Sequence, residues 1–432
     1  MARKIGFFTG TRADYGLLFP LLKKIQTAPD WELSLLVSGM HLSPEFGLTV
    51  QQIESDGFHV DFRVENLLSA DTPLAQIKST ALGLMGYGDA LRQMSPDLLV
   101  ILGDRFEAFA AATAAYILHI PIIHLHGGET TQGATDEAFR HSISKMAYWH
   151  FTSSEEHKKR VIQLGESPDR VFNVGAIGLD NIRSLTLLSK EQNAESLGID
   201  RKEEYLLITY HPETLDQIPA VQQLEILVEA LFTASNHMLV CTLPNADAEG
   251  RSIIEAWKTL KSKFPNRLVL HTSLGQLRYL SAVKYASAVV GNSSSGIIEV
   301  PSLGTPTVNV GYRQGGRQAA ASVIQCTEMQ VESIQKCIQL AISSEFVQKA
   351  KSIENVYGDG LTADKILAQL NFFPTNIDFT PPHLNRIIRP AAAIVEMIIG
   401  GRGTLAIFYI SSAFANICPG QFIQYTVFGC SH

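Results

Sequence analysis

The sequence has few cysteines and few charged residues, and both shortages narrow the possible classes of protein. Five cysteines among 432 residues show neither paired short spacings nor the density of a disulfide framework, so we expect free thiols and no zinc site. Charged residues make up 18% of the chain and its formal net charge is −7, which leaves no electrostatic footprint for nucleic acid. An anionic ligand must therefore be bound by local arginines and helix ends.

A secretory signal and a membrane-spanning run are also lacking. The stretch "MARKIGFFTG" enters a strand directly, without the apolar core and small-residue cleavage site of a signal peptide. The apolar portion at 405–417 is too short and too interrupted by serine and asparagine to cross a bilayer. With 46% hydrophobic residues the chain is typical of soluble globular proteins, and we expect a cytoplasmic location without membrane contact.

Short apolar runs alternate with helical patterns along most of the chain, which indicates βαβ units and parallel sheets covered on both faces. One series of such units extends to about residue 175, and a second begins at "EYLLITYHPE". We therefore expect an α/β protein with two Rossmann-like, doubly wound domains, 1–182 and 183–370, and a cleft between them. The last helix of the second domain is expected to be able to cross back to the first. The segment 371–432 has an atypical composition, and its sequence indicates no particular role.

Polar clusters end the apolar runs, at the positions where parallel-sheet enzymes gather their functional groups. The clusters are "TGTRADYG", "SGMHL", "LGDRFE", "HLHGGE", "YHPE", "PNAD" and "GNSSSG". They place the following candidates at strand ends: Arg12, His41, Asp104, Arg105, His126, Glu129, His211 and Asn245. We expect these side chains to face the cleft, with a solvated surface position as the alternative for Arg12.

The loop "GNSSSG" opens a predicted helix with Ser293, Ser294 and Ser295 between Gly291 and Gly296. The first N–H groups of a helix lack intrahelical partners and carry partial positive charge, which suits phosphate oxygens. One serine is enough to cap a helix. Three serines between two glycines that allow close backbone approach indicate an anion site, and capping alone is the alternative.

Charged residues after this loop suggest a nucleotide site. Glu299 follows the serines by about one and a half turns among apolar neighbours, so we expect it to accept hydrogen bonds from ribose hydroxyls. An exposed helical glutamate is the alternative. Arg313 in "GYRQGGR" carries a permanent charge that suits a diphosphate. Arg317 could do the same or lie in solvent.

In the first half, Asp104 and Arg105 end a very apolar strand, where a charge is costly unless it faces the cleft or forms a structural salt bridge. In "HLHGGE", strand alternation puts His124 and His126 on one face. No third metal ligand is evident nearby, so acid–base work or hydrogen bonding is favoured over a metal site. Asp136 opens the following helix, either as its cap or as a site residue.

In this order the motifs resemble those of the hydrolysing UDP-N-acetylglucosamine 2-epimerases of bacterial sialic-acid-type pathways. The likeness covers residues 3 to about 370 and includes "DEAFRHSISKM" and "GNSSSGIIEVPSLGTPTVNVGYRQ" besides the strand-end clusters. It implies a GT-B fold, a homodimer or homotetramer, and the reaction of UDP-N-acetylglucosamine with water to give N-acetylmannosamine and UDP. No metal or redox cofactor is required for that reaction.

The resemblance also implies roles for individual residues. It assigns to UDP binding Arg12, Ser293, Ser294, Glu299 and Arg313. It places around the sugar Asp104, Arg105, Asp136 and His211. Related non-hydrolysing bacterial enzymes and the animal enzyme have a catalytic glutamate at the position of His126 in this chain. His126 and Glu129 are the two candidates for its replacement.

The implied chemistry explains these residue types. The proton on C2 of the sugar is not acidic, so its removal must be coupled to departure of UDP from C1, which gives a glycal. Water then adds at C1 while C2 is protonated from the other face, so two acid–base groups and a stabilised leaving diphosphate are needed. One alternative is the same reaction on UDP-2,4-diacetamido-2,4,6-trideoxyglucose for legionaminic acid. A GT-B glycosyltransferase and a non-enzymatic UDP-sugar sensor are the others.

Overall fold

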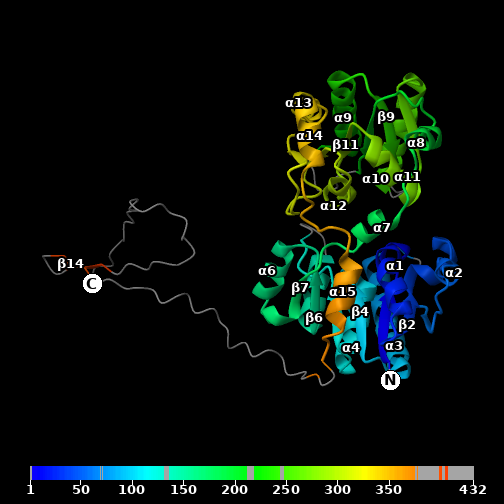
Figure 1. Ribbon diagram of the computed structural model, residues 1–432, viewed down its shortest axis with the longest axis vertical. Helices are drawn as coiled ribbons and strands as arrows, with labels where there is room; N and C mark the ends of the chain where they lie inside the picture. The colour runs from blue at the N-terminus through cyan, green and yellow to red at the C-terminus, as the bar shows by residue number, and fades with distance from the viewer. Residues whose placement is uncertain are drawn as a thin grey trace. The chain divides into compact units, whose positions relative to one another are not determined.

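The computed structural model describes residues 2–68, 70, 72–130, 136–211, 218–243, 248–374, 377, 398–400 and 404–406. Its main part contains two parallel β-sheets with helices packed on them (Figure 1). The first sheet has the strand order β3-β2-β1-β4-β5-β6-β7 within the described residues. Its strands are β1 (Arg3–Thr9), β2 (Trp31–Ser38), β3 (Phe62–Val64), β4 (Leu98–Leu102), β5 (Ile122–Leu125), β6 (Trp149–Thr152) and β7 (Val171–Asn173).

Both faces of the first sheet are buried. Successive residues of β4 show this, because Val100 packs into the core on one face and Leu99 and Ile101 into the core on the other. The first face is covered by α1 (Arg12–Thr27), α2 (Val50–Ser55) and α15 (Thr362–Leu370). The second is covered by α3 (Pro73–Met94), α4 (Phe106–Ile117) and α5 (Asp136–Met146). α6 (Glu155–Gln163) packs against β6 and β7.

The second sheet repeats this design with the order β10-β9-β8-β11-β12-β13. Its strands are β8 (Tyr205–Thr209), β9 (Met238–Thr242), β10 (Leu268–His271), β11 (Ala288–Gly291), β12 (Thr307–Val310) and β13 (Val323–Cys326). One face packs on α9 (Ala220–Ala234), α10 (Ala248–Lys263) and α13 (Val331–Ala341). The other packs on α8 (Lys190–Leu197) and α11 (Gly275–Tyr285). The expectation of two doubly wound parallel sheets is thus confirmed.

Short helices also occur in this half of the chain. α12 (Ser294–Ile298) follows β11, and α14 (Ser344–Lys351) follows α13. Four 3-10 helices complete the described elements: η1 (Gly39–Leu42), η2 (Pro44–Phe46), η3 (Pro168–Arg170) and η4 (Val300–Leu303).

The chain returns from the second sheet to the first through its last helix. α15 lies against α1 and against α7 (Gly178–Ser184), as Figure 1 shows for α1. The carboxylate of Asp180 accepts hydrogen bonds from the backbone N–H groups of Thr362 at 2.9 Å and Ala363 at 2.6 Å. N–H groups at the start of a helix have no partner within the helix. Asp180 of α7 therefore caps α15, although it lies 182 residues earlier in the sequence.

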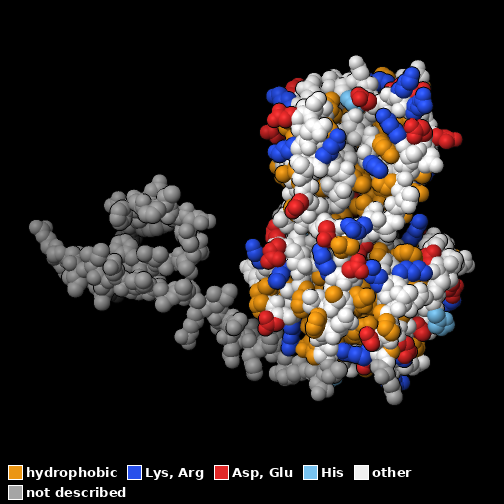
Figure 2. Space-filling view, viewed as in Figure 1, with side chains coloured by type: hydrophobic (Ala, Val, Ile, Leu, Met, Phe, Trp, Pro, Cys, Tyr) orange, Lys and Arg blue, Asp and Glu red, His pale blue; other side chains and the backbone are white. Residues whose placement is uncertain are grey.

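Residues 380–432 form a separate unit, in which β14 (Ile398–Gly400) pairs antiparallel with β15 (Thr404–Ala406). In the part of the chain that the structure describes, no helix is both long and apolar enough to cross a membrane. Lysine and arginine side chains are interspersed with aspartate and glutamate over the visible face of the main unit (Figure 2). This mixture agrees with the modest net charge and gives that face no single-signed surface for a polyanion.

Candidate active site

The carboxyl end of β4 presents an ion pair between a partly exposed arginine and a buried glutamate. Glu107, in the first turn of α4, has a fully buried side chain, and its carboxylate accepts hydrogen bonds from Arg105 Nε at 3.1 Å and Nη2 at 3.0 Å. Burial alone would lower the pKa of Arg105, but the charge and hydrogen bonds of Glu107 outweigh it and raise that pKa. Arg105 is thus held as a cation in one orientation. Its position is compatible with both expectations from the sequence, a residue of the site and a partner in a structural salt bridge.

Glycines at neighbouring strand ends make room for this pair. A Cβ atom added to Gly39 would lie 2.8 Å from the carbonyl oxygen of Gly10 and 3.4 Å from Glu107 Oε1, and φ at Gly39 is +59°. Any other residue at this position would therefore have both an unfavourable backbone conformation and a steric clash. The ends of β1 and β2 consequently approach Glu107 closely with backbone atoms.

A third charged group, Asp14, lies beside the pair in the first turn of α1. Its Oδ2 atom accepts a hydrogen bond from the backbone N–H of Gly10 at 3.3 Å. Burial raises the pKa of Asp14 to about 6, against the opposing effect of the Arg105 charge and with a smaller contribution from Glu107. The Asp14 carboxyl group therefore titrates near neutral pH beside Arg105.

Arg140 of α5 connects two further strand ends. It is almost fully buried, forms an ion pair with Asp104 after β4, and donates through Nη1 to the backbone carbonyl of Glu129 after β5 at 2.7 Å. Asp136 begins the same helix. Burial, together with the negative charge of Asp104, raises the pKa of Asp136. The structure therefore brings Asp104, Asp136 and the backbone of Glu129 to one place.

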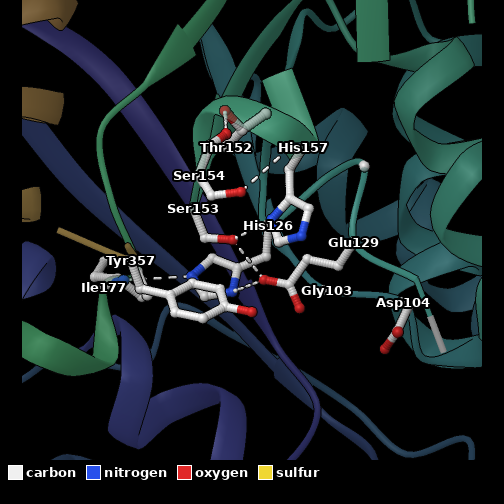
Figure 3. Close-up of polar contacts among 12 residues, drawn as sticks. Gly103, Asp104, His126, Glu129, Thr152, Ser153, Ser154, His157, Ile177 and Tyr357 are labelled. Atoms are coloured by element: carbon white, nitrogen blue, oxygen red, sulfur yellow. Dashed lines mark hydrogen bonds and ion pairs between the residues drawn. The ribbon is translucent and has the colours of Figure 1, made fainter. Parts of the chain in front are cut away.

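His126 and Glu129 form the centre of a hydrogen-bonded network (Figure 3). The backbone N–H of Ile177 donates to His126 Nε2 at 3.3 Å, so Nε2 is an acceptor and the ring proton lies on Nδ1. Nδ1 in turn lies 3.0 Å from Glu129 Oε1. Ser153 donates to the same oxygen at 2.7 Å, and its own oxygen lies 2.9 Å from Nδ1 of His157. Both nitrogens of His126 are thus engaged inside the protein.

The network keeps Glu129 ionised. Burial alone would raise the pKa of Glu129, but the hydrogen bond from His126, with the charge of Arg317, lowers it below the usual value. Burial lowers the pKa of His157 to about 4, so that ring is neutral at pH 7. Arg317 comes from the loop after β12 and lies near enough to influence Glu129, so it is not a purely solvated arginine.

His124 differs from His126 in its surroundings. Its ring is fully buried in β5, with Nε2 at 2.8 Å from the carbonyl oxygen of Gly103 and Nδ1 at 3.0 Å from Ser144 Oγ. His126 follows the end of the strand with φ of +65°. Strand alternation therefore does not extend to His126, and the prediction of a face shared through alternation is wrong for this physical reason.

In the second domain Asn292 organises the end of β11. Its fully buried amide accepts from the backbone N–H of His211 and donates to the carbonyl of His211, both at 2.8 Å. The backbone carbonyl oxygen of Asn292 accepts hydrogen bonds from Arg313 Nη1 at 3.0 Å and from Gln314 Nε2 at 2.9 Å. A Cβ atom on the preceding Gly291 would lie 2.0 Å from the carbonyl of Thr209, so only glycine fits there. His211 and Arg313 are thereby fixed at neighbouring strand ends.

The serine loop begins α12 as the sequence predicts. Ser293 is the N-cap residue, and its hydroxyl accepts from the backbone N–H of Ser295 at 3.4 Å. The hydroxyl of Ser295 donates to the Glu299 carboxylate. Burial raises the pKa of Glu299, and the bond from Ser295 opposes that effect. Only Ser293 provides the cap, so capping of this helix does not use the hydroxyl group of Ser294. The loop can therefore both cap the helix and bind an anion.

Glu299 also borders a cavity of about 340 Å³. The cavity is lined by residues that include Thr242, Ser273, Gln276, Tyr279, Leu280 and Glu299. The hydroxyl of Tyr279 is buried and has no hydrogen-bond partner among the described residues. Ser295 and Thr209 are near enough to lower the pKa of this phenol, which burial raises to about 12. A ligand with hydroxyl groups could satisfy the Tyr279 hydroxyl.

The remaining predicted residues occupy varied positions. Arg12 is exposed at the first residue of α1, and Gly296 is buried within α12. His41 is fully buried, with Nε2 at 3.0 Å from Thr9 and Nδ1 at 2.7 Å from Thr49, so its ring offers no surface for a ligand. Asn245 lies outside the described residues. Among those residues, no group of three or more His, Cys, Asp and Glu side chains could hold a metal ion.

Sequence reasoning missed several polar residues around the site. They are Asp14, Glu107, Arg140, Ser153, Tyr279 and Asn292. Asp14, Glu107 and Asn292 belong to strand-end clusters, so proximity to the named candidates was an available signal. Arg140, Ser153 and Tyr279 enter through folding contacts across the chain, and no spacing in the sequence marks them.

Comparison with known proteins adds to this geometry. Residues 23–371 match the protein family described as UDP-N-acetylglucosamine 2-epimerase. A hydrolysing GDP/UDP-N,N'-diacetylbacillosamine 2-epimerase from Campylobacter jejuni is 39% identical over 346 residues, covering 80% of this chain and 89% of the relative. A UDP-N-acetylglucosamine 2-epimerase from Neisseria meningitidis serogroup B is 32% identical over 341 residues, covering 79% and 88%. The crystal structure of a Neisseria meningitidis UDP-GlcNAc 2-epimerase bound to UDP-GlcNAc has a similar fold, with a TM-score of 0.68 at 20% identity over 85% of this chain and 100% of that one.

Proposed function

Because the chain belongs to the UDP-N-acetylglucosamine 2-epimerase family, we propose that it converts UDP-N-acetylglucosamine and water to N-acetylmannosamine and UDP. The family and the GT-B type of fold agree with the resemblance found in the sequence motifs. The observation that supports the reaction most directly is that Arg140 pairs with Asp104 and binds the backbone carbonyl of Glu129, while Asp136 begins the same helix and lies near enough to Asp104 for its pKa to be raised. Two neighbouring carboxyl groups in different electrostatic environments suit a reaction with two proton transfers.

In the proposed mechanism Asp104 and Asp136 perform the proton transfers at C2. Asp104 is paired with the buried Arg140, which holds its carboxylate in a fixed position to accept a proton. Asp136 has a raised pKa, so it is better suited to hold a proton and return it to C2 of the glycal. The two roles follow from environments that differ although both groups are carboxyls.

Glu129 has a different task in this mechanism. The carboxylate is held ionised by His126 and Ser153, and a group with so low a pKa is a weak base. A fixed negative charge does stabilise the positive charge that develops at C1 as UDP leaves. His126, whose Nε2 accepts from Ile177, acts by positioning Glu129. The glutamate at the His126 position in related enzymes is thus replaced by Glu129, which His126 orients.

The UDP half of the substrate is assigned to the second domain. The N-terminal end of α12 with Ser294, together with Arg313, binds the diphosphate and stabilises the charge on the leaving group. The cavity beside Glu299 and Tyr279 receives the nucleoside, whose ribose hydroxyls hydrogen-bond to these two side chains. His211, fixed through its backbone by Asn292, faces the sugar.

A second donor is UDP-2,4-diacetamido-2,4,6-trideoxyglucose, which is UDP-N,N'-diacetylbacillosamine. This donor is supported by the Campylobacter jejuni relative that is 39% identical to this chain, because that relative is named as an N,N'-diacetylbacillosamine 2-epimerase. Purified protein should be incubated with each donor, and UDP and the free sugar should be identified by mass spectrometry and NMR. The ratio of the two kcat/KM values identifies the preferred donor. UDP release without an epimerised sugar, or no turnover of either donor, would refute the proposed function.

The solvent isotope provides a second readout of the proposed reaction. In D₂O the released sugar should carry deuterium at C2, because the original C2 proton is lost and replaced. Asp104→Asn and Asp136→Asn should each lower kcat by about a hundredfold or more, within the range for loss of a general acid or base, and should leave the Kd of UDP within about twofold. A product that keeps its protium at C2 would exclude the elimination route.

A further inference from the structure

Two segments that link the sheets lie directly against each other, one after β7 and the other before α15. The backbone N–H of Ala176 donates to the carbonyl oxygen of Tyr357 at 2.7 Å. A Cβ atom added to Gly175 would lie 2.8 Å from the same oxygen, and φ at Gly175 is +96°. The segments therefore touch backbone to backbone, which requires glycine at residue 175. This contact of residues 175–177 with 357–358 is termed the joint.

Tyr357 connects the joint to a loop of the second sheet. Its side chain is buried in a small apolar cluster with Leu179 of α7 and Ile297 of α12. Its hydroxyl donates a hydrogen bond to the backbone carbonyl of Gln318, in the loop after β12, at 2.9 Å. The ring of Tyr357 is thus fixed at both ends, by its backbone in the joint and by its hydroxyl at the loop.

The ring of Tyr357 contacts His157 of α6, with the ring centroids 6.0 Å apart and the planes inclined by 45°. Burial lowers the pKa of His157 to about 4, so its ring carries a single proton at pH 7. His157 Nδ1 lies 2.9 Å from Ser153 Oγ, and the Ser153 hydroxyl donates its only hydrogen to Glu129 Oε1. Ser153 therefore accepts a hydrogen bond from His157, which places the ring proton on Nδ1.

A second chain of hydrogen bonds leads from the joint to the same oxygen atom. The backbone N–H of Ile177 donates to His126 Nε2 at 3.3 Å, and His126 Nδ1 lies 3.0 Å from Glu129 Oε1 (Figure 3). Within the described part of the chain, Glu129 Oε2 accepts no hydrogen bond. Both chains thus hold one oxygen of the carboxylate and leave the other for a ligand.

We propose that Tyr357 is a positioning residue for Glu129: its ring keeps His157 oriented so that Nδ1–H meets Ser153, and its hydroxyl ties this arrangement to the loop after β12. The inference rests on the proposed function, which places Glu129 beside C1 of the sugar. Without the restraint the His157 ring can take the other tautomer and accept from Ser153. Glu129 then loses one of the two hydrogen bonds on Oε1.

The first test is a double-mutant cycle on the rate of UDP release in a single turnover. Ser153→Ala should lower this rate about tenfold, as for a lost hydrogen bond to a charged group, and Tyr357→Phe about fivefold. The double variant should match Ser153→Ala within about twofold, because both changes break the same chain of hydrogen bonds. The affinity for UDP, measured by calorimetry, should stay within about twofold in every variant.

Tyr205→Phe is the matched control. Tyr205 is also a buried tyrosine, and its hydroxyl donates to the backbone carbonyl of Ala282 at 2.6 Å in the core of the second sheet. Both variants lose a tyrosine hydroxyl bound to a backbone carbonyl, so the Tm should fall in both. The rate of UDP release should fall only in Tyr357→Phe.

A second readout needs no turnover. In protein labelled with ¹⁵N-histidine, the His157 signals are identified by their absence in His157→Gln, and the shift of Nδ1 reports whether this nitrogen carries the proton. Wild type should show the proton on Nδ1. Tyr357→Phe, and to a greater extent Tyr357→Leu, should move part of it to Nε2. Circular dichroism establishes that both variants are folded.

Three results would overturn the inference. They are additive effects in the cycle, a proton on Nε2 of His157 in wild type, and a weaker UDP affinity with an unchanged rate, which would confine the effect of Tyr357 to the nucleotide loop. Failure of the proposed function is a separate result. It is read from the deuterium content of the released sugar, whereas the histidine spectrum is measured without substrate.

Discussion

Removal of the Asp180 carboxylate should destabilise the protein measurably, although Asp180 is remote from the strand-end clusters in sequence. The side chain is buried and accepts the N–H groups of Thr362 and Ala363, which are themselves buried at the start of α15. Leu361, the residue before the helix, makes no side-chain cap. In Asp180→Ala both N–H groups would lose their acceptor, at about 1–3 kcal/mol for each unsatisfied buried group.

The expected net loss of unfolding free energy is about 2–4 kcal/mol, since relief of the buried charge offsets part of the two lost bonds. For a domain of this size that corresponds to a decrease in Tm of roughly 5–10 °C. The assay is thermal unfolding followed by circular dichroism. Asp364→Ala is the matched control, because Asp364 in the same helix is half-exposed and its ion pair with Lys24 should contribute less than about 1 kcal/mol. A Tm for Asp180→Ala that equals the control would refute this account of the cap.

The same residue gives a prediction for pH. Burial raises the pKa of Asp180 in the folded state, although the N–H groups of Ala363 and Thr362 oppose the shift. A carboxyl whose folded pKa exceeds its unfolded value stabilises the fold fully below the unfolded pKa, and this contribution is lost as pH rises through the folded pKa. The advantage of wild type over Asp180→Asn in urea unfolding should therefore decrease as pH rises above about 4, the ordinary pKa of an aspartate. An advantage that increases with pH would contradict the raised pKa.

Three further changes test the site directly. Gly128→Ala should abolish turnover while retaining UDP binding, because φ is +80° and the new Cβ would lie 2.4 Å from the carbonyl of His157, next to the proposed site at Glu129; full activity would show that this turn can relax. Ser294→Ala should weaken UDP binding about fivefold in calorimetry, as for one lost hydrogen bond to phosphate, and an unchanged Kd would remove this hydroxyl from the site. Tyr279→Phe should leave the Tm of the ligand-free protein unchanged, since the hydroxyl has no partner among the described residues, but should weaken UDP binding about threefold or more; equal affinity would place the ribose elsewhere.

Local patterns were sufficient to predict the sheets and the strand ends. Every residue of the apolar run "LLVIL" in β4 is buried. Such continuous apolar runs are typical of parallel sheets that are covered on both faces. The polar clusters follow these runs because the chain must leave the sheet there, and in the structure Asp104 lies near enough to Asp136 for its charge to raise the pKa of Asp136. The serine loop was located for the same reason, since a strand, a turn and a helix start are all encoded within a few residues.

Partners that are distant in the sequence could not be predicted in this way. Asp180 caps a helix that begins 182 residues later, and Arg140 reaches Asp104 across 36 residues. Neither pairing has a periodic signal, because each depends on how packed elements happen to be adjacent in the fold. His126 shows a second limit, since a single residue at positive φ ends the strand alternation on which its predicted direction depended.

The hydrogen bonds of His126 argue against the role of catalytic base that its position in the sequence suggests. A histidine at the place of a catalytic glutamate is expected to act as the base, and an isolated imidazole would suit that role. Here the N–H of Ile177 occupies Nε2, and Nδ1 faces Glu129 Oε1, so neither nitrogen is open to the substrate. In the proposed mechanism Glu129, three residues later, supplies the carboxylate. The hydrogen bond from His126 lowers the pKa of Glu129, so residue type alone was insufficient to assign the two roles.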